Sequence, residues 1–384
     1  MRVLVANAGS SSLKLSLLGE DDRTLHSREL EAPADRVDQA ALRVALDGGL
    51  GDADVVGHRI VHGGERFREA VLVDGEVEAA LRALSYLAPL HQEKSLAALD
   101  AVSAVLPGLP AVACFDTAFH ATLPVATATY ALPLAWREQH AIRRYGFHGL
   151  SHAWVARRAP ALLGREGDPG LRLVSCHLGA GASLCAIAGG HSIDTTMGFT
   201  PLEGLVMATR SGSVDPGLVL WLLQHGGQTQ DELAHTLEHE SGLLGLAGTA
   251  DMREVLSRGD AGERRAQLAL EVYVHRLASA IAAMVASLGG LDAVIFTGGV
   301  GAGSPRVRER ALERLGFLGL ALDQPRNGAV AGEDADVSAG AASARTLVIE
   351  AREDLEIARQ VRELLGRGGG RDGQACGAGD GVRL

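Results

Sequence analysis

The chain has 384 residues, a length typical of two or three domains, and its 47 % hydrophobic and 22 % charged residues are a globular composition. Its net charge of −11 argues against a nucleic-acid binder, which would need a basic surface, and against binding to an anionic membrane. An anionic substrate must therefore be held by a local cluster of positive groups.

The cysteines and the apolar segments indicate a cytoplasmic protein. The four cysteines form neither a CxxC pair nor a zinc-knuckle spacing, so we expect reduced thiols. The first apolar run is broken by Asn7 and Gly9, which does not fit a signal peptide. The longest apolar stretch, residues 277–291, is too short to span a bilayer and predicts a buried helix.

Strand and helix patterns alternate along the chain. Short β-favouring runs end in polar or glycine-rich turns, as in "RVLVANAG", "ADVVGHRIVHGG", "PAVACFDTAFH", "RLVSCHLGAGASLCAIAGG" and "LDAVIFTGGVGAGS". Apolar spacings of three and four residues between them predict helices. This alternation predicts an α/β protein. The predicted helices cover residues 77–87, 93–105, 267–288, 305–315 and 355–365.

Two antiparallel hairpins are predicted, at residues 3–18 and 173–194, and they resemble one another. "VLVANAGSSSLKLSLLG" and "LVSCHLGAGASLCAIAG" share the order of a strand, a turn of small residues and a second strand. Such a repeat favours two domains built on one plan, each presenting a tight turn to a shared cleft. The glycine-rich segment from residue 366 is expected to be disordered, together with Cys376.

The glycine turns are candidate phosphate sites. No GxxxxGK[ST] sequence is present, which excludes a P-loop enzyme, and no GxGxxG follows a strand, which disfavours a Rossmann site. Glycine allows backbone amides to converge on an anion. Ordinary tight turns would explain any one of these segments, but three of them each follow an apolar strand. They lie at residues 9–12, 179–183 and 298–304.

Four polar residues stand in nearly apolar surroundings: Arg59, Asp116, His148 and Arg210. Charges in such surroundings are seldom buried without partners. Alone, each fits a structural salt bridge or a satisfied core histidine. Together in one cleft they would bind and neutralise small anionic oxygens. His148 and His152 have a metal-binding spacing, but they lack the zincin glutamate and a third ligand, and no GxSxG elbow supports a serine hydrolase.

Seven segments resemble the successive signatures of acetate kinases, in the family's order, from residue 3 to about 364. They are "VANAGSSSLKLSL", "GHRIVHGGERF", "CFDTAFHATLP", "RRYGFHGLSH", "CHLGAGAS", "TPLEGLVMATRSGSVDPG" and "FTGGVGAGSPRVRE". The resemblance implies the actin-like ATPase (ribonuclease H-like) fold, with two similar α/β domains flanking a nucleotide cleft. It also implies direct transfer of the ATP γ-phosphoryl group to acetate, with Mg²⁺ or Mn²⁺, by a homodimer.

The resemblance also implies domain boundaries. Residues 1–146 would form the N-terminal actin-like domain, and residues 147–352 the C-terminal domain with the nucleotide site. Residues 353–366 would form a helix that packs back on the N-terminal domain, and residues 367–384 a disordered tail.

Site residues follow from the matching positions. Arg59 and Arg210 match the arginines around the carboxylate and the transferred phosphoryl group, Asp116 the active-site aspartate, and His148 the histidine that stabilises the transition state. The pocket for the methyl group matches Val61, Leu90, Phe147 and Pro201. The residues that would hold Mg²⁺ match Asn7 and Glu353, and Glu350 is a weaker candidate for the same role. The nucleotide positions are Ser10, Ser12, Lys14, His177, Gly179, Gly181, Asp251, Met252, Arg253, Gly299, Val300, Gly301 and Gly303.

Most departures from the family pattern lie on the nucleotide side; a further one is His91-Gln92-Glu93, where the family has "HNP". Ala180 and Ala302-Gly303 replace asparagine and Glu-Asn, and Met252 replaces phenylalanine. Pyrophosphate or GTP as donor therefore stays an alternative, as does a preference for propionate or butyrate, because one methylene changes discrimination by only about 1–3 kcal/mol. An actin-like nucleotide-binding interaction module and a degenerate regulatory family member are the alternatives outside catalysis.

Overall fold

The computed structural model describes residues 1–9, 12–31 and 37–368, without the side chains of residues 89–91. Ser10, the side chain of Leu90 and the predicted disorder of the tail lie outside this part. The chain divides into two compact units. The first unit comprises Met1–Ile60, Glu69–Phe115 and the chain from Asp354, and the second comprises Val61–Arg68 and Asp116–Glu353.

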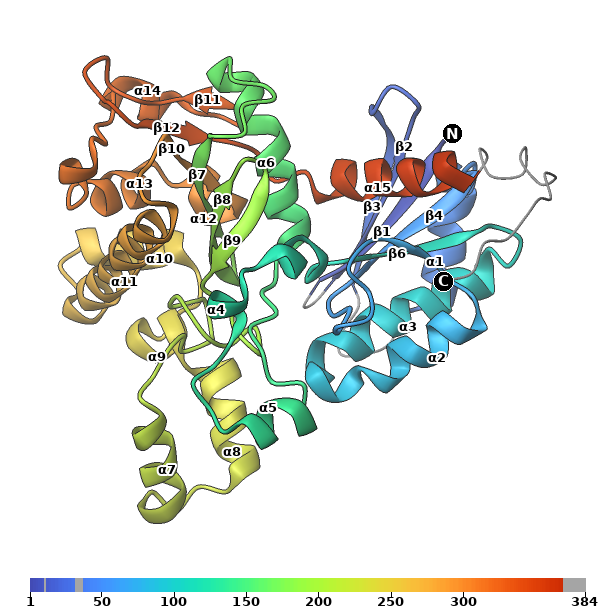
Figure 1. The fold of residues 1–384 in the computed structure, drawn as a ribbon, viewed down its shortest axis with the longest axis horizontal. Coiled ribbons are helices and arrows are strands. Elements are labelled where there is room, and N and C mark those ends of the chain that lie inside the picture. Colours follow the sequence, from blue (N-terminus) through green and yellow to red (C-terminus); the bar gives the residue numbers. More distant parts are fainter. Residues whose placement is uncertain (10–11, 32–36, 369–384) are drawn as a thin grey trace, which may run out of the picture. The chain divides into compact units, whose positions relative to one another are not determined.

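The first unit is built on a six-stranded mixed sheet (Figure 1). Strand β1 is antiparallel to β2 and parallel to β4, β2 is antiparallel to β3, and β6 is parallel to β4 and antiparallel to β5. The order across the sheet is β3 (Thr24–Glu31), β2 (Ser12–Leu18), β1 (Val3–Ala8), β4 (Val55–Ile60), β6 (Ala111–Phe115) and β5 (Val71–Leu72).

The second unit repeats this plan strand for strand. β7 is antiparallel to β8 and parallel to β10, β8 is antiparallel to β9, and β12 is parallel to β10 and antiparallel to β11. Both sheets therefore have one topology, which confirms the predicted α/β fold with two similar domains. The order is β9 (His191–Thr195), β8 (Ala182–Ala188), β7 (Arg172–Leu178), β10 (Ala293–Thr297), β12 (Arg345–Val348) and β11 (Ala335–Asp336).

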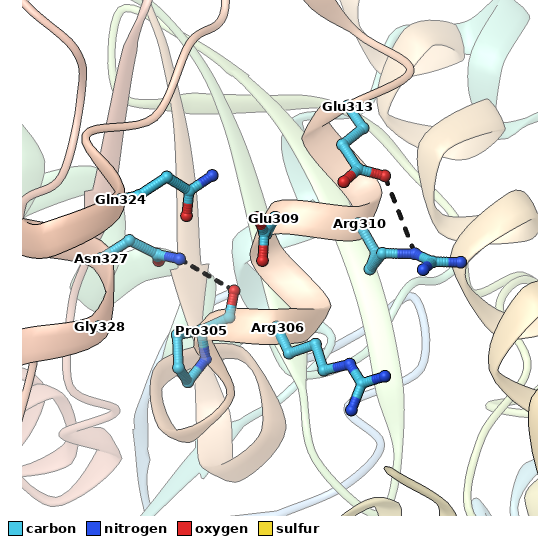
Figure 2. A pocket seen from close by; sticks show the side chains of 8 residues that line it. All are labelled: Pro305, Arg306, Glu309, Arg310, Glu313, Gln324, Asn327 and Gly328. Atoms are coloured by element: carbon cyan, nitrogen blue, oxygen red, sulfur yellow. Dashed lines mark hydrogen bonds and ion pairs between the residues drawn. The ribbon is translucent and has the colours of Figure 1, made fainter. Parts of the chain in front are cut away.

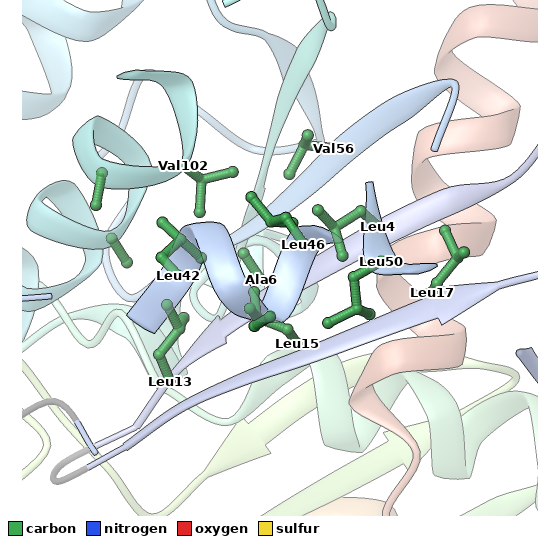
Figure 3. Packing of buried hydrophobic residues seen from close by; sticks show 13 residues of the cluster. Leu4, Ala6, Leu13, Leu15, Leu17, Leu42, Leu46, Leu50, Val56 and Val102 are labelled. Atoms are coloured by element: carbon green, nitrogen blue, oxygen red, sulfur yellow. The ribbon is translucent and has the colours of Figure 1, made fainter. Parts of the chain in front are cut away.

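Helices cover both faces of the first sheet. On one face, leucines of β1 and β2 pack with Leu42 of α1 and Val102 of α3, and Figure 3 shows this cluster. On the other face, Gly57 of β4 meets α15 so closely that a Cβ atom there would lie 2.6 Å from Ile357 Cγ2. The helices are α1 (Gln39–Ala45), α2 (Gly75–Ala83), α3 (Pro89–Val105) and α15 (Glu353–Gly368), with short helical turns at Leu46–Leu50 and Ser85–Leu87.

The second sheet lies between α6 (Gly149–Leu163) and α11 (Arg264–Leu288) (Figure 1). Val155 and Ala159 of α6 join a buried cluster with Leu173 and Ile295 of the sheet. Helix α11 is long and apolar enough to cross a membrane by composition, but its apolar residues, such as Leu277 and Ile281, are buried in this unit. It is therefore a core helix, as the sequence predicts.

The remaining helices of the second unit are short. They are α4 (Val125–Ala128), α5 (Leu134–Gln139), α7 (Pro216–His225), α8 (Gln230–His235), α9 (Gly242–Ala247), α10 (Met252–Asp260), α12 (Gly298–Gly303), α13 (Pro305–Leu312) and α14 (Gln324–Ala329), with helical turns at Ala118–Thr122, Thr236–Glu240 and Gly316–Leu318. Each of the five predicted helices is present, with ends that differ by a few residues.

The division between the units falls after Phe115, whereas the sequence analysis puts the domain boundary after residue 146. The segment that follows Phe115 is tied to the second sheet: His120 Nδ1 lies 2.8 Å from Ser192 Oγ, and Thr122 Oγ1 donates to the Ser192 carbonyl at 2.9 Å. These contacts explain why the residues between 116 and 146 belong to the second unit.

His58 of β4 is a fully buried imidazole in the first unit. It is 1 % exposed, and among the residues that the structure describes neither ring nitrogen has a hydrogen-bond partner. Its strand neighbours are Ala6 and Ala113, whose small side chains leave room for the ring. Burial lowers the pKa of His58 from 6.5 to about 4 because the protonated ring would lose its hydration.

Because His58 is buried in its neutral form, we expect the first unit to lose stability at acidic pH. Since the folded pKa lies below the unfolded one, the contribution of His58 to stability is complete above pH 6.5 and is lost as the pH falls towards 4. The full shift corresponds to about 3 kcal/mol. In denaturant titrations at pH 7 and pH 4, we expect His58→Leu to lose about 3 kcal/mol less on acidification than the wild type. Equal losses in both proteins would contradict this account.

Candidate active site

His148 stands where the chain turns into α6, and its backbone is left-handed, with φ of 57°. The next residue, Gly149, donates its backbone N–H to the Asp116 carbonyl at 2.9 Å. A Cβ atom at Gly149 would lie 2.1 Å from that oxygen, so only glycine allows the two backbones to approach. The predicted residues Asp116 and His148 are thereby held on adjoining segments.

Two serines orient two predicted histidines. Ser183 Oγ lies 2.9 Å from His148 Nδ1, and Ser151 Oγ lies 2.8 Å from His177 Nδ1. The two rings stack with centroids 4.4 Å apart. Because the serines contact the Nδ1 atoms, the Nε2 edges are turned towards the Gly179–Gly181 segment between β7 and β8. A Cβ atom at Gly179 would lie 3.8 Å from His177 Nε2.

His148, Arg210 and the glycine turn meet at one point. A Cβ atom at Gly181 would lie 3.2 Å from His148 Nε2 and 3.6 Å from Arg210 Nη1. The predicted residues His148, Arg210 and Gly181 therefore face a common space, although they are far apart in sequence. An imidazole N–H and a guanidinium that border the same space can together bind the oxygens of one small anion.

Arg210 is held in place from the other side by a well-braced loop. Its Nη1 atom donates to the Pro201 carbonyl at 3.2 Å. Arg144 donates to the Met197 carbonyl at 3.1 Å and to Glu203 at 2.9 Å, and Tyr130 also donates to Glu203. This network fixes the segment that carries Pro201.

The electrostatics of Arg210 favour an anion. Burial lowers the pKa of Arg210, and the charge of Glu238 acts in the opposite direction. An arginine side chain nevertheless stays protonated in proteins. A largely desolvated cation gains from an anionic ligand more than an exposed one does, because the local dielectric is low.

The apolar residues predicted for the substrate lie in both units. Val61 and Phe147 are buried in the second unit, where the ring of His62 packs edge-on against Phe147, 5.6 Å between centroids. Pro201 is half-buried in the braced loop. Leu90 belongs to α3 of the first unit.

Asn7 and Arg59 are neighbours in the first unit. Arg59 Nη1 of β4 donates to Asn7 Oδ1 of β1 at 3.1 Å. Across the hairpin, Asn7 is paired with Lys14 of β2, whose side chain is exposed, and Ser12 Oγ donates to Glu29 at 2.6 Å. The first glycine hairpin thus ends beside the predicted arginine.

The remaining nucleotide candidates lie at two short helices of the second unit, α10 and α12. Asp251 caps α10 by accepting from the Arg253 N–H at 2.8 Å and forms an ion pair with the Arg253 side chain at 2.6 Å. These hydrogen bonds lower the pKa of Asp251 to about 2. Met252 is buried beneath them.

The third glycine segment is a helix rather than a tight turn, which corrects the sequence interpretation. Gly299, Val300, Gly301 and Gly303 lie in α12. The reason is Arg308, a fully buried arginine that the sequence analysis misses: its Nη1 atom donates to the Gly301 and Ala302 carbonyls at 2.9 and 2.7 Å. These bonds satisfy the carbonyls at the end of the helix.

Sequence reasoning also misses Ser151, Ser183 and Arg144. Both serines lie inside the motifs "GFHGLSH" and "CHLGAGAS", close to the predicted site residues His148 and Gly181. A serine beside a predicted histidine is a weak signal, because serine is common in turns. Arg144 is one of many arginines, and only the structure shows the carbonyls that it binds.

A pocket of about 440 Å³ lies between α13 and α14 (Figure 2). Its lining contains none of the predicted site residues. Arg306 is bound by Asp260 at 2.6 Å, and Arg310 lies 3.8 Å from Glu313, so the charges of this pocket are largely balanced. It is therefore a poorer anion site than the space beside Gly181.

Among the described residues no group of three histidine, cysteine or acidic side chains is arranged to hold a metal ion.

The fold of this chain is found in solved carboxylate kinases. It resembles the acetate kinase of Porphyromonas gingivalis with a TM-score of 0.86 and 34 % identity, covering 95 % of this chain and 99 % of that one. It resembles a propionate kinase from Francisella tularensis subsp. tularensis SCHU S4 equally, with a TM-score of 0.86 and 34 % identity over 94 % and 98 % of the two chains.

The sequence comparisons give the family. Residues 40–359 match the acetokinase family. The chain is 44 % identical to an acetate kinase of Gloeobacter violaceus, covering 96 % of this chain and all of that protein, and 46 % identical to one of Deinococcus radiodurans, covering 95 % and 98 %. The protein belongs to the acetokinase family.

Proposed function

We propose that the protein is an acetate kinase, which reversibly transfers the γ-phosphoryl group of ATP to acetate and forms acetyl phosphate and ADP. The observation that carries the proposal is the meeting of His148 Nε2 and Arg210 Nη1 beside Gly181, which suits a small anionic group. Relatives named acetate kinase, with 44–46 % identity over nearly the whole chain, support acetate as the acceptor of the phosphoryl group.

The chemistry needs positioning more than acid–base catalysis. Acetate is ionised at neutral pH, so its oxygen attacks phosphorus without a general base. One bond forms between the acetate oxygen and phosphorus while the bond from phosphorus to the ADP oxygen breaks. The barrier lies in bringing two anions together, so Arg210 and His148 act by neutralising and orienting the transferred group.

The acceptor would be held by the remaining predicted residues. We propose that Arg59 binds the carboxylate and the transferred phosphoryl group, and that Asp116 is the active-site carboxylate. The methyl group would lie against Val61, Phe147 and Pro201, with Leu90 as a further contact. Guanidinium suits carboxylate and phosphoryl oxygens because its parallel N–H groups bind two oxygens at once.

The ATP site is proposed on the glycine segments. The hydroxyls of Ser10 and Ser12 and the Lys14 ammonium would contact phosphates from the first hairpin. From the second unit, His177, Gly179 and Gly181 would do the same. Gly299, Val300, Gly301 and Gly303 of α12 and Asp251, Met252 and Arg253 of α10 would contact the nucleoside.

Mg²⁺ is proposed to be held by Asn7 and Glu353, with Glu350 as the weaker candidate. The donor set fits, because Mg²⁺ prefers oxygen ligands and is usually bound by one or two protein groups, water and substrate phosphates. When bound, it would neutralise phosphate charge. Asn7 Oδ1 already accepts from Arg59, so this amide oxygen points towards the phosphoryl-binding arginine.

An assay for acyl phosphate formation by the purified protein tests this function. Hydroxylamine traps acyl phosphates, so acetate, propionate and butyrate can each be paired with ATP, GTP and pyrophosphate. We expect the highest kcat/KM with acetate and ATP. Propionate is the second candidate, because the Francisella propionate kinase resembles this chain as well as the Porphyromonas enzyme does. No acyl phosphate with any pair would reject the kinase in favour of a nucleotide-binding interaction module.

We further propose a cytoplasmic homodimer. Helix α7 has no buried residue although it is almost entirely apolar, and Leu218, Leu220 and Trp221 are each about half exposed. Trp136 of α5 is also exposed. A second copy of the chain would cover such a surface. Light scattering should give the mass of two chains, and Trp221→Glu should shift it towards one; a monomeric wild type would contradict the proposal.

A further inference from the structure

A row of hydrogen-bonding side chains connects His148 to the interior of the second unit. Ser183 Oγ of β8 lies 2.9 Å from His148 Nδ1 and also 2.9 Å from His152 Nε2 of α6. On its far side, His152 Nδ1 lies 2.9 Å from Ser175 Oγ of β7. Ser175, His152 and Ser183 are completely buried, so bulk water does not reach these contacts.

The shared hydroxyl couples the protonation of the two rings. Ser183 has one hydroxyl proton, so it can donate to only one of the two ring nitrogens and must accept from the other. His152 is neutral, because burial and the neighbouring His120 and His177 lower its pKa well below the ordinary value. It therefore carries one N–H, and the position of that proton decides how Ser183 is oriented towards His148.

Ser175 sets the direction of the row. Among the residues that the structure describes, His152 is the only hydrogen-bond partner of the Ser175 hydroxyl. If Ser175 accepted from His152, its own proton would be buried without a partner, at a cost of about 1–3 kcal/mol. Ser175 therefore donates to His152 Nδ1, His152 Nε2–H donates to Ser183, and Ser183 donates to His148 Nδ1.

We propose that His152, together with Ser175 and Ser183, is a positioning residue that holds His148 in the tautomer with its proton on Nε2. That proton faces the space beside Gly181 and Arg210, where it can be donated to an oxygen of the transferred phosphoryl group; this last step rests on the proposed function. The other tautomer would turn a lone pair towards an anion, which would repel it. The partner of one ring nitrogen commonly decides the tautomer in this way.

Ser183→Ala tests the row, and the chain provides a matched control. Ser192 is equally buried and lies 2.8 Å from Nδ1 of another buried histidine, His120, in the same unit. Its described hydrogen bonds do not reach His148 or the row directly, and in the variant His120 keeps its other contact, from Nε2 to the Phe147 carbonyl at 3.0 Å. Ser192→Ala should therefore keep a kcat close to that of the wild type. Ser183→Ala should lower kcat about 10- to 100-fold, by analogy with the loss of the orienting partner of a metal-binding histidine, with little change in KM.

His152 provides a second pair of variants that separates hydrogen bonding from packing. His152→Gln keeps an amide N–H near the position of Nε2 and can still donate to Ser183. His152→Leu fills a similar volume without a donor. We expect the glutamine variant to retain a clearly higher kcat than the leucine variant. Equal kcat values in the two variants would mean that His152 acts only by packing and would overturn its assigned role.

The tautomer itself can be read from ¹⁵N NMR of histidine-labelled protein without any turnover. In the wild type, His148 should show a protonated Nε2 and an unprotonated Nδ1, and Ser183→Ala should shift the ring towards a mixture. A wild-type His148 protonated on Nδ1 would overturn the inference, as would equal kcat values for Ser183→Ala and Ser192→Ala. A wild type with the expected spectrum that forms no acyl phosphate would refute the proposed function and leave the tautomer assignment standing.

Discussion

Arg210→Ala should lower kcat for acetyl phosphate formation about 100- to 1,000-fold, the effect of removing one preorganised donor from a developing negative charge. The physical reason is the position of its Nη1 atom, which faces the same space as His148 Nε2 beside Gly181. The lost contact is with the reacting group. We expect the fold to remain, because Arg210 Nη1 bonds the neutral Pro201 carbonyl and the Met207 sulfur, and the loop of Pro201 is also fixed by Arg144 and Tyr130.

Two further variants make this result interpretable. Arg210→Lys keeps the charge but loses the paired N–H groups, so it should recover only part of the activity. Arg326→Ala removes an exposed arginine of α14 whose ion pair with Asp323, at 3.6 Å, involves no predicted site residue, and it should leave kcat unchanged. An Arg210→Ala enzyme with near-normal kcat would remove Arg210 from the mechanism.

Gly149→Ala should destabilise the protein by about 3 kcal/mol, at the upper end for overpacking, because the added carbon meets backbone rather than a side chain that can move. It would lie 2.1 Å from the Asp116 carbonyl oxygen and 3.0 Å from Phe119 Cβ. The N–H of Gly149 would also lose its bond to that oxygen. Because His148 precedes this glycine, we expect kcat to fall as well.

Gly75→Ala is the matched control. Gly75 is the first residue of α2, as Gly149 is the first residue of α6, but a Cβ atom there has no neighbour within 4 Å. Alanine should be neutral or slightly stabilising at this position. Denaturant titrations of both variants give the comparison. A Gly149→Ala protein as stable as Gly75→Ala would show that the Asp116 and His148 backbones do not need their close approach.

The alternation of strands and helices was sufficient to predict an α/β protein, and the repeated hairpins predicted its two similar domains. The two hairpins of similar wording are β1–β2 and β7–β8, which occupy equivalent places in two sheets of the same order. Apolar periodicity also predicted α11 as a core helix, because its buried residues recur every three or four positions. The glycine segment that became α12 was misjudged, because the arginine that closes it, Arg308, lies outside the segment.

The site was predictable only in part. Polar residues in nearly apolar runs identified Arg59, Asp116, His148 and Arg210, since a charge in such a run needs a partner. Their supports were not predictable, because Ser151 of α6 and Ser183 of β8 are ordinary helix and strand residues until the distances to His177 and His148 are known. The match to the acetokinase family indicated acetate as the acceptor of the phosphoryl group, which no pattern of charges could have specified.

A crystal structure with acetate, ADP, Mg²⁺ and a planar metal-fluoride mimic of the phosphoryl group would test the site most directly. If the account is right, the mimic lies beside Gly181, with Arg210 Nη1 and His148 Nε2 each about 3 Å from its ligand atoms, the distance of a hydrogen bond. If the mimic is bound elsewhere in the protein, or if either side chain is turned away from it, the assignment of this space to phosphoryl transfer is wrong.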